Sequence, residues 1–293
     1  MRGRTYTTVM QRTILKATVG VGKHPCRFVT AEEVEHYRQF GWVKLNGFVR
    51  AGVVELILKS ALERMGEDAD SNAVIETIGP GVEKKIAYFN AEYGGGLENP
   101  PVRSLIEHVG KNAKSLMSRS RPVGVRYFSD FYAPKLPSSK QARHGGNGPT
   151  SFHQDFTNFS VDRSGGMTFW VALEDYGPEF GTMSFVNGSH RLGVLGNYRT
   201  YQKGEDLLDI YPNLRDELKL SEPMSYAAGD VTVHSHMTAH GAGANLTDRP
   251  RWAYLMLVQP TDACWTGAPA EAFDSNGMQI NQPLPEDRFP TLA

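Results

Sequence analysis

Three segments in the first half of the chain place apolar residues at the spacing of an amphipathic helix. The run Thr30-Ala31-Glu32-Glu33 has the pattern of a capping box, which predicts a helix from Ala31 to about Gly41. Helical spacing of apolar residues predicts a second helix from Val53 to Met65 and a third from Val102 to about Ser118. We expect these helices to form one layer against a sheet.

From Val123 onward the pattern changes to short apolar runs separated by glycine and proline. Such runs are typical of strands joined by turns. Residues 134–150 are rich in Ser, Gly and Pro, which predicts a loop placed to act as a lid. Its residues Lys140, Arg143 and His144 are expected to be solvated, and contact with an anionic substrate is the alternative. Residues 197–220 indicate a partly helical insertion broken at Pro212. Strands are expected at Val123 to Phe128, Met167 to Leu173, Thr182 to Val186, Asp230 to Ser235 and Trp252 to Gln259.

Helices followed by many short strands predict an α+β, mainly β fold, and a jelly roll of the cupin type with flanking N-terminal helices is the expected architecture. The open mouth of such a barrel suits a small ligand. We expect a single domain over residues 1–293. Its parts are an N-terminal arm (1–29), a mostly helical layer (30–121), the jelly-roll core (122–262) with the lid loop and the insertion, and a C-terminal tail (263–293).

Composition narrows the classes of partner and location. A hydrophobic content of 40% is enough for a substantial core, and a net charge of -1 gives no reason to expect nucleic acid or an anionic membrane as a partner. No apolar stretch approaches the roughly 18 residues of a membrane-spanning helix. Cys26 and Cys264 are the only cysteines, which excludes a disulfide framework and suits a reducing cytoplasm, the expected location. Residues 1–29 carry basic but no acidic residues, as a solvated arm or an extra edge strand would, and leave a homodimer open.

The segment His153-Gln154-Asp155 is the first chemical signal. In a strand, residues i and i+2 point to the same face, so this spacing directs an imidazole and a carboxylate at one metal ion. Two histidines and one carboxylate form the facial triad of non-haem Fe(II) oxygenases, which leaves coordination positions open. The third ligand must come from another strand. His240 precedes a glycine-rich turn and is favoured, whereas His234 and His236 are expected to be strand histidines or donors that orient a ligand.

Arg251 follows His240 by eleven residues and begins an alternating run in which Arg251, Ala253 and Leu255 share a face. An arginine on an apolar face needs an anionic partner. Its planar guanidinium binds a carboxylate through two hydrogen bonds. Either a ligand carboxylate or an internal acid would satisfy it. Arg249 would share the same face if the strand extended back through Pro250, and it is the less favoured anchor.

The ordered set of these motifs resembles the phytanoyl-CoA dioxygenase family of Fe(II)/2-oxoglutarate oxygenases. The set is specific because H-x-D, G-S-H, G-D and the histidine-to-arginine spacing occur in the family's order. The resemblance extends over roughly residues 30–260. The matching segments are Phe40 to Val43, Gly47 to Val49, Ser151 to Asp155, Gly181 to His190, Gly229 to Val231, His240 to Asn245 and Asp248 to Arg251.

The resemblance implies a role for further residues. Arg251 would bind the C5 carboxylate of 2-oxoglutarate, and Trp170, with Thr168 on the same face of its strand, would lie near this cosubstrate. A side chain on the strand before the lid would also contact it, which Ser129 or Tyr132 supplies here. Two positions depart from the family pattern. Ala242 stands where a serine often bonds the cosubstrate, and Asn187 replaces the proline of P-G-S-H.

The sequence therefore predicts a dioxygenase, an enzyme dependent on Fe(II), 2-oxoglutarate and O2, that oxidises an unactivated C–H bond of a small molecule and releases succinate and CO2. The expected outcomes are hydroxylation, desaturation, epimerisation, cyclisation or endoperoxidation, and the expected substrate is a natural-product intermediate. The retained carboxylate of Asp155 argues against halogenation, since related halogenases have Ala or Gly there. The alternative is a metal-binding cupin-type isomerase, or a non-catalytic ligand-binding jelly roll, that does not use 2-oxoglutarate.

Overall fold

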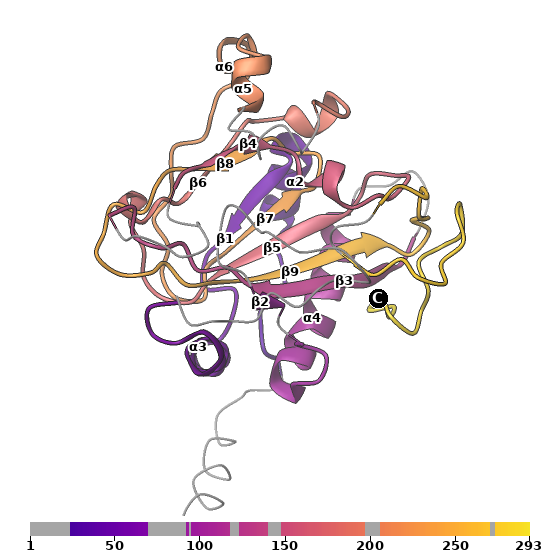
Figure 1. Ribbon diagram of the computed structural model, residues 1–293, viewed down its shortest axis with the longest axis horizontal. Coiled ribbons are helices and arrows are strands. Elements are labelled where there is room, and N and C mark those ends of the chain that lie inside the picture. Colours follow the sequence, from indigo (N-terminus) through magenta and orange to yellow (C-terminus); the bar gives the residue numbers. More distant parts are fainter. Residues whose placement is uncertain are drawn as a thin grey trace, which may run out of the picture.

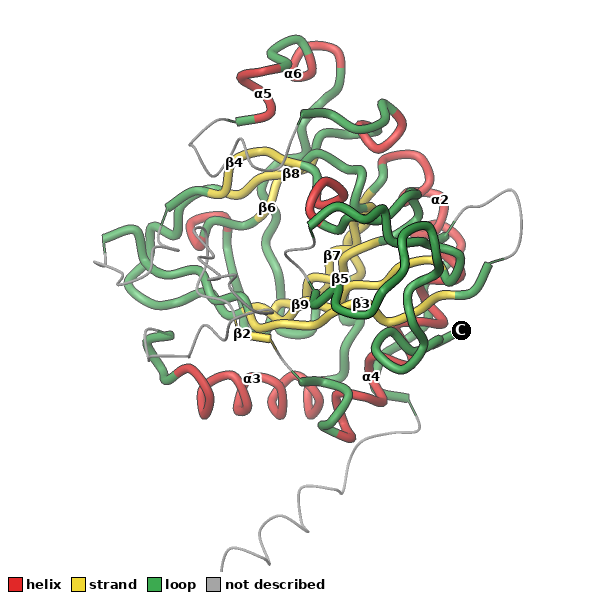
Figure 2. Tube along the Cα trace, turned by 45° about the vertical axis from the view of Figure 1, so that its right-hand side comes forward, coloured by secondary structure: helices red, strands yellow, loops and turns green. Residues whose placement is uncertain are grey.

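The computed structural model describes residues 24–69, 92–93, 95–117, 123–139, 148–196, 206–269 and 273–293. A large sheet lies in the middle of the molecule, a small sheet faces it on one side, and helices α3 and α4 cover its other side (Figure 1; Figure 2). Most of the basic N-terminal arm and the middle of the expected lid, including Lys140, Arg143 and His144, lie outside the described residues.

The three predicted helices are confirmed to within two residues at their ends. They are α2 (Ala31–Phe40), α3 (Ala51–Met65) and α4 (Pro100–Leu116). The capping box of α2 is formed: the Thr30 side chain accepts from the Glu33 backbone, and the Glu33 carboxylate accepts from the Thr30 N–H. The helix ends at Gly41, whose φ of 82° lies in the left-handed region that glycine adopts without strain.

The large sheet is antiparallel and has the strand order β1-β7-β5-β9-β3-β2. Its outer face carries the main hydrophobic core, which joins the apolar stripes of all three helices to alternate residues of the strands. In chain order its strands are β1 (Trp42–Leu45), β2 (Glu92–Tyr93), β3 (Val125–Tyr132), β5 (Met167–Ala172), β7 (Val231–Ser235) and β9 (Ala253–Pro260).

The small sheet consists of β4 (Thr150–His153), β8 (His240–Ala242) and β6 (Met183–Phe185), in that order. Two facing antiparallel sheets form the jelly roll that the sequence predicts. Short helices α5 (Leu207–Ile210) and α6 (Leu214–Glu217) lie beyond the small sheet, where the sequence predicts the insertion broken at Pro212 (Figure 1). The remaining turns include the 3-10 helices η1 (Asp155–Asn158), η2 (Pro178–Phe180) and η3 (Ser189–Arg191).

The C-terminal tail closes one end of the barrel. Phe273, Leu284 and Phe289 pack against aromatic residues of the core, and the Arg126 guanidinium donates to the carbonyls of Leu284 and Phe289. A buried arginine that donates to several carbonyls helps to fix this segment, whose own backbone pairing in the described residues consists of isolated bridges such as Arg126 with Thr291.

Two expectations need correction, one about the helical layer and one about the lid loop. Trp42–Leu45, expected within a mostly helical layer, forms an edge strand of the large sheet because it pairs with β7. The first part of the expected lid is fixed to the barrel, since Lys135 pairs with Arg251 and Pro137 with Asn245. Among the described residues, no helix has the length and apolar character needed to cross a bilayer.

Candidate metal and cosubstrate site

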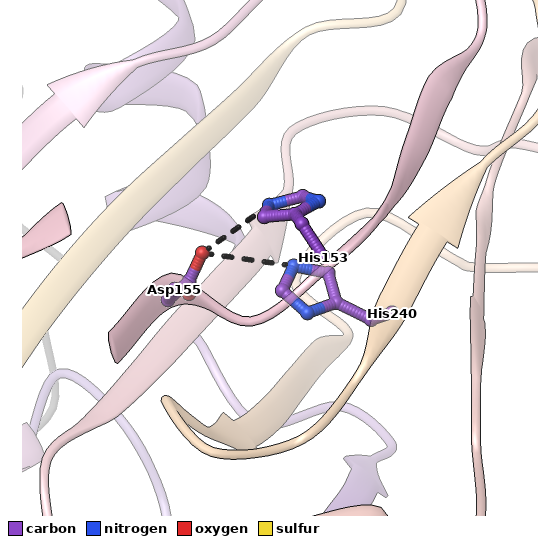
Figure 3. Close-up of side chains that lie close together, drawn as sticks. All are labelled: His153, Asp155 and His240. Carbon is purple, nitrogen blue, oxygen red and sulfur yellow. Dashed lines mark ion pairs between the residues drawn. The ribbon is translucent and has the colours of Figure 1, made fainter. Parts of the chain in front are cut away.

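His153, Asp155 and His240 converge in the space between the two sheets (Figure 3). One ligand atom from each lies within 4.8 Å of the others. Asp155 Oδ1 is 3.5 Å from His153 Nε2 and 3.8 Å from His240 Nε2. Ligands about 2.1 Å from one divalent ion would lie roughly 3 Å apart at right angles, so a small contraction would close the set around an ion. The donor set fits the facial triad of non-haem iron enzymes.

The local backbone directs each of these side chains. The strand ends at His153, and Asp155 begins η1, which corrects the expectation that both residues lie on one strand. They still face the same side because Gln154 keeps an extended backbone, with φ -111° and ψ 130°. The buried Gln154 side chain donates to the Met237 carbonyl and accepts from the Leu195 N–H, so the turn between the two residues is anchored.

The tautomers of the two histidines follow from their hydrogen bonds. His153 Nδ1 lies 2.8 Å from the Ser151 carbonyl, and His240 Nδ1 lies 3.0 Å from the Thr238 carbonyl. A carbonyl only accepts, so each Nδ1 carries a proton, and Nε2, the nitrogen that faces Asp155, is the one that can offer a lone pair to a metal ion. This is the arrangement that a metal-binding imidazole requires.

The charges of the cluster oppose one another. Burial alone would raise the pKa of Asp155, but the facing His240 and the adjacent His153 and His234 outweigh this effect and hold that pKa well below its usual range. Burial, with a smaller effect of His234, lowers the pKa of His240 well below its usual range. The cluster therefore presents an ionised carboxylate and a neutral imidazole, the protonation states that a cation needs.

The other two histidines of the segment have different surroundings. His234 Nε2 lies 3.1 Å from Asp155 Oδ2, so His234 borders the cluster as the expected orienting donor would. His236 packs on Phe159 and faces Gln259, and burial lowers its pKa to about 3. Thr168, expected beside the cosubstrate, donates its hydroxyl to Asp155 Oδ2 at 3.0 Å.

Arg251 lies on the inner face of the large sheet. It is 6% exposed, its guanidinium lies over the Trp170 ring at 5.1 Å, and it donates to the Gly181 carbonyl. Its Nε has no hydrogen-bond partner, and burial lowers its pKa to about 10. Arg249, the less favoured anchor, lies at the surface and pairs with Glu174 at 2.9 Å.

Lys135 is a second buried cation at this site, which sequence reasoning missed. It is 1% exposed, pairs across a backbone bridge with Arg251, and donates to Thr150 Oγ1 at 3.1 Å. Burial, and to a smaller degree Arg251, lower the pKa of its ammonium well below the usual range. Within the described ranges, neither Lys135 nor Arg251 has an ion-pair partner. The sequence indicates the burial of Lys135 only through its apolar neighbours in the segment Pro134 to Pro137.

Of the two residues proposed from the strand before the lid, only one faces this interior. Ser129 pairs with Leu257, on the inner face. Tyr132 pairs with Tyr254 and packs into the outer core, where its hydroxyl donates to Ser60 Oγ at 3.0 Å. Residues three apart in a strand point to opposite faces, so the assignment of Tyr132 to the cosubstrate is wrong.

An apolar wall adjoins the cluster on the side of the C-terminal tail. Phe131, Leu255 and Phe156 pack there and remain partly accessible, together with Trp265 and Met278. The interior thus contains two buried cations, Arg251 and Lys135, and this aromatic wall.

These features can be compared with known proteins. The family model described as phytanoyl-CoA dioxygenase (PhyH) matches residues 24–253. The chain belongs to the phytanoyl-CoA dioxygenase family. The resemblance inferred from the motifs is confirmed, and so is the predicted class of enzyme, a 2-oxoglutarate-dependent dioxygenase.

Two curated relatives match different shares of the chain. Phytanoyl-CoA dioxygenase domain-containing protein 1 of Danio rerio is 29% identical over 154 residues, which are 50% of this chain and 49% of that protein. The chain thus matches about half the length of this relative. A probable alpha-ketoglutarate-dependent hypophosphite dioxygenase of Stutzerimonas stutzeri is 23% identical over 244 residues, or 80% of this chain and 79% of that protein.

Solved structures support the fold. The epimerase SnoN, in complex with Fe3+, alpha ketoglutarate and nogalamycin RO, has a TM-score of 0.66 and 25% sequence identity. The match covers 89% of this chain and 98% of that one. The jelly-roll fold predicted from the sequence is therefore confirmed, and iron and 2-oxoglutarate are the groups that such a relative binds.

Proposed function

We propose that this protein oxidises an unactivated C–H bond of a small organic molecule, with His153, Asp155 and His240 as the ligands of Fe(II). The convergence of these three side chains carries the proposal. Bound iron with 2-oxoglutarate and O2 would supply the oxidising chemistry, with succinate and CO2 as products. The protein's own part is to hold the ligands, orient the cosubstrate and keep water from the reacting centre.

Arg251 and Lys135 together would bind the C5 carboxylate of 2-oxoglutarate. Two buried cations that have no acid partner among the described residues need an anion, and the carboxylate end of a dicarboxylic acid supplies one. The Trp170 ring packs against the Arg251 guanidinium, so it would position this anchor for the cosubstrate carboxylate. Ser129 shares this interior face and stays a candidate contact.

Thr150 would replace the hydroxyl that the family pattern places at Ala242. The two residues pair directly across β4 and β8, so their side chains point to the same face. Thr150 also accepts a hydrogen bond from the Lys135 ammonium, which places its hydroxyl beside the two buried cations. A hydroxyl from the neighbouring strand would therefore serve where serine is missing.

The substrate would be an apolar, ring-bearing molecule that enters from the aromatic side. Phe131, Leu255 and Phe156 line that side, and their partial accessibility leaves them able to contact a ligand. The SnoN complex contains nogalamycin RO, which supports a natural-product intermediate as the substrate class. Placement of the substrate C–H bond would decide among hydroxylation, desaturation, epimerisation, cyclisation and endoperoxidation. A cytoplasmic location stays a prediction.

Binding of 2-oxoglutarate to the Co(II)-loaded protein, measured by calorimetry, tests this proposal against a cupin without 2-oxoglutarate chemistry. Arg251→Ala should abolish binding, because it removes the buried anchor. Arg249→Ala is the matched control and should leave binding intact, since Arg249 pairs with Glu174 at the surface. Equal binding by both variants would favour the cupin alternative. Succinate release across a library of apolar ring compounds would then identify the substrate.

A further inference from the structure

The two oxygens of the Asp155 carboxylate have different neighbours. Oδ1 faces the two histidines of the candidate metal site, at 3.5 Å from His153 Nε2 and 3.8 Å from His240 Nε2. Oδ2 lies 3.0 Å from Thr168 Oγ1 and 3.1 Å from His234 Nε2. An ionised carboxylate only accepts hydrogen bonds, so Thr168 and His234 both donate to Oδ2.

These two donors reach the carboxylate from the large sheet, whereas His153 and His240 reach it from the small sheet. Thr168 on β5 and His234 on β7 are directly paired in the strand register, so their side chains stand side by side on the inner face. One cross-strand pair thus holds one oxygen of a side chain that belongs to neither strand.

The position of His234 is fixed by its packing. Its ring lies 5.5 Å from the Phe185 ring and 4.2 Å from the His240 ring. Phe185 in turn stacks on Trp42 at 4.9 Å, and the Trp42 indole donates to Asn187 Oδ1 at 2.8 Å. A ring held in this way keeps its Nε2 directed at Asp155, and His234 lies outside the group of three convergent ligands.

We infer that Thr168 and His234 are positioning residues that hold Oδ2 of Asp155 back, so that the carboxylate binds the metal through Oδ1 alone. This inference rests on the proposed function. A carboxylate that binds through both oxygens would occupy two positions of a six-coordinate ion, and with two histidines only two would stay open. Binding through one oxygen leaves three coordination positions open. A cosubstrate that chelates the ion through two atoms, together with O2, requires these three positions.

Titration with Co(II), followed by visible absorption, tests the inference without turnover. Thr168→Val keeps the shape of the side chain and removes its donor, and His234→Phe keeps an aromatic ring without a donor. Each should weaken Co(II) binding about 10- to 100-fold, the usual effect of losing a hydrogen bond to a ligand. Each should also change the intensity of the Co(II) bands, because the freed carboxylate alters the coordination number.

Conservative variants separate positioning from packing. Thr168→Ser and His234→Gln keep a donor at the same reach and should restore affinity and spectrum. His236→Gln is the matched control, a buried histidine two residues from His234 that does not contact Asp155, and it should bind Co(II) as the parent does. Thermal unfolding of the metal-free proteins would show that every variant is folded.

The outcomes distinguish this inference from the proposed function. If Thr168→Val and His234→Phe bind Co(II) with the parent's affinity and spectrum, the inference is overturned while the metal site stands. The inference is equally overturned if His234→Gln is as weak as His234→Phe, since the donor would then not be what matters. If the parent protein itself binds no Co(II), the metal site fails and the inference fails with it.

Discussion

Buried charged side chains on the two faces of the large sheet differ in how many hydrogen-bond partners surround them. On the outer face, Asp130 is 1% exposed and accepts from the Tyr127 hydroxyl at 2.5 Å, the Tyr254 hydroxyl at 2.6 Å and the Gly96 N–H. On the inner face, the described part of the chain offers Lys135 one threonine hydroxyl and Arg251 one backbone carbonyl. Buried polar groups are normally satisfied within the protein.

The difference separates a structural charge from a ligand-binding one. Asp130 is satisfied by the chain itself and ties the Gly95–Glu98 turn to the sheet. Gly96 permits this approach, because a Cβ there would lie 2.5 Å from the Tyr254 hydroxyl. Within the described ranges the inner cations keep unused donors, such as Arg251 Nε, and such donors are expected where a ligand completes the site. Variants on the two faces should therefore affect different measurements.

The largest effect is expected for Asp155→Ala. Loss of a ligand should weaken metal binding by more than the roughly 100-fold typical of losing a ligand's hydrogen-bond partner. Succinate release should fall below detection. The metal-free protein should stay folded, because the carboxylate serves the ion rather than the core. Co(II) titration and thermal unfolding measure the two quantities, and intact metal binding would refute the ligand role.

Lys135→Met should weaken 2-oxoglutarate binding by about 2–5 kcal/mol, the range for truncating one partner of a buried charge pair. The metal-free, cosubstrate-free protein should be as stable as the parent or more stable. The substitution replaces a buried ammonium, which has no acid partner in the part of the chain that the structure describes, by an apolar chain of similar length. Calorimetry measures the affinity for 2-oxoglutarate, and urea unfolding measures the free energy of unfolding. A loss of stability with unchanged cosubstrate affinity would place Lys135 with Asp130 as a structural charge.

The same lysine predicts a pH dependence. Its pKa is lowered by burial and by Arg251 in the free protein, and a bound carboxylate raises it. Affinity for 2-oxoglutarate should be highest below the free-state pKa and should fall as pH rises toward the pKa of the complex. Lys135→Met should remove this part of the pH profile. Parallel profiles for parent and variant would mean that Lys135 does not titrate on binding.

Asp130→Asn should lower the free energy of unfolding by about 1–3 kcal/mol, because the amide replaces an acceptor with a donor opposite Tyr127 or Tyr254. Cosubstrate affinity should stay within experimental error of the parent. Chemical denaturation and calorimetry on the same preparation give both values. A marked loss of 2-oxoglutarate binding would show that the two faces are coupled.

The smallest effect is expected for Tyr132→Phe. The variant loses one hydrogen bond to Ser60 on the outer face, for about 0.5–1.5 kcal/mol of stability. It should bind 2-oxoglutarate as the parent does, whereas substitution of Lys135 or Arg251 on the inner face should weaken that binding. Weaker cosubstrate binding by this variant would contradict the assignment of Tyr132 to the outer core.

Sequence reasoning was most successful where one local rule determined the outcome. The capping box and Gly41 fixed α2, and H-x-D with a distant histidine pointed to three residues that the fold brings together. Prediction from sequence failed where the pairing register between strands decides which face of the sheet a side chain occupies. Ser129 and Tyr132 were equal candidates until their pairing with Leu257 and Tyr254 placed them on opposite faces. Lys135 was missed because it lies in a segment without periodicity, and burial of a lysine beside Arg251 cannot be read from neighbours in sequence.

The division of the candidate metal ligands between the two sheets has a mechanical consequence. His153 and His240 belong to the small sheet, whereas Asp155 is tethered to the large sheet by Thr168 and His234. An ion bound by all three residues would link the small sheet to the large sheet. Loading the ion should therefore stiffen the small sheet and the α5–α6 region beyond it, and stripping it should expose that half first to protease.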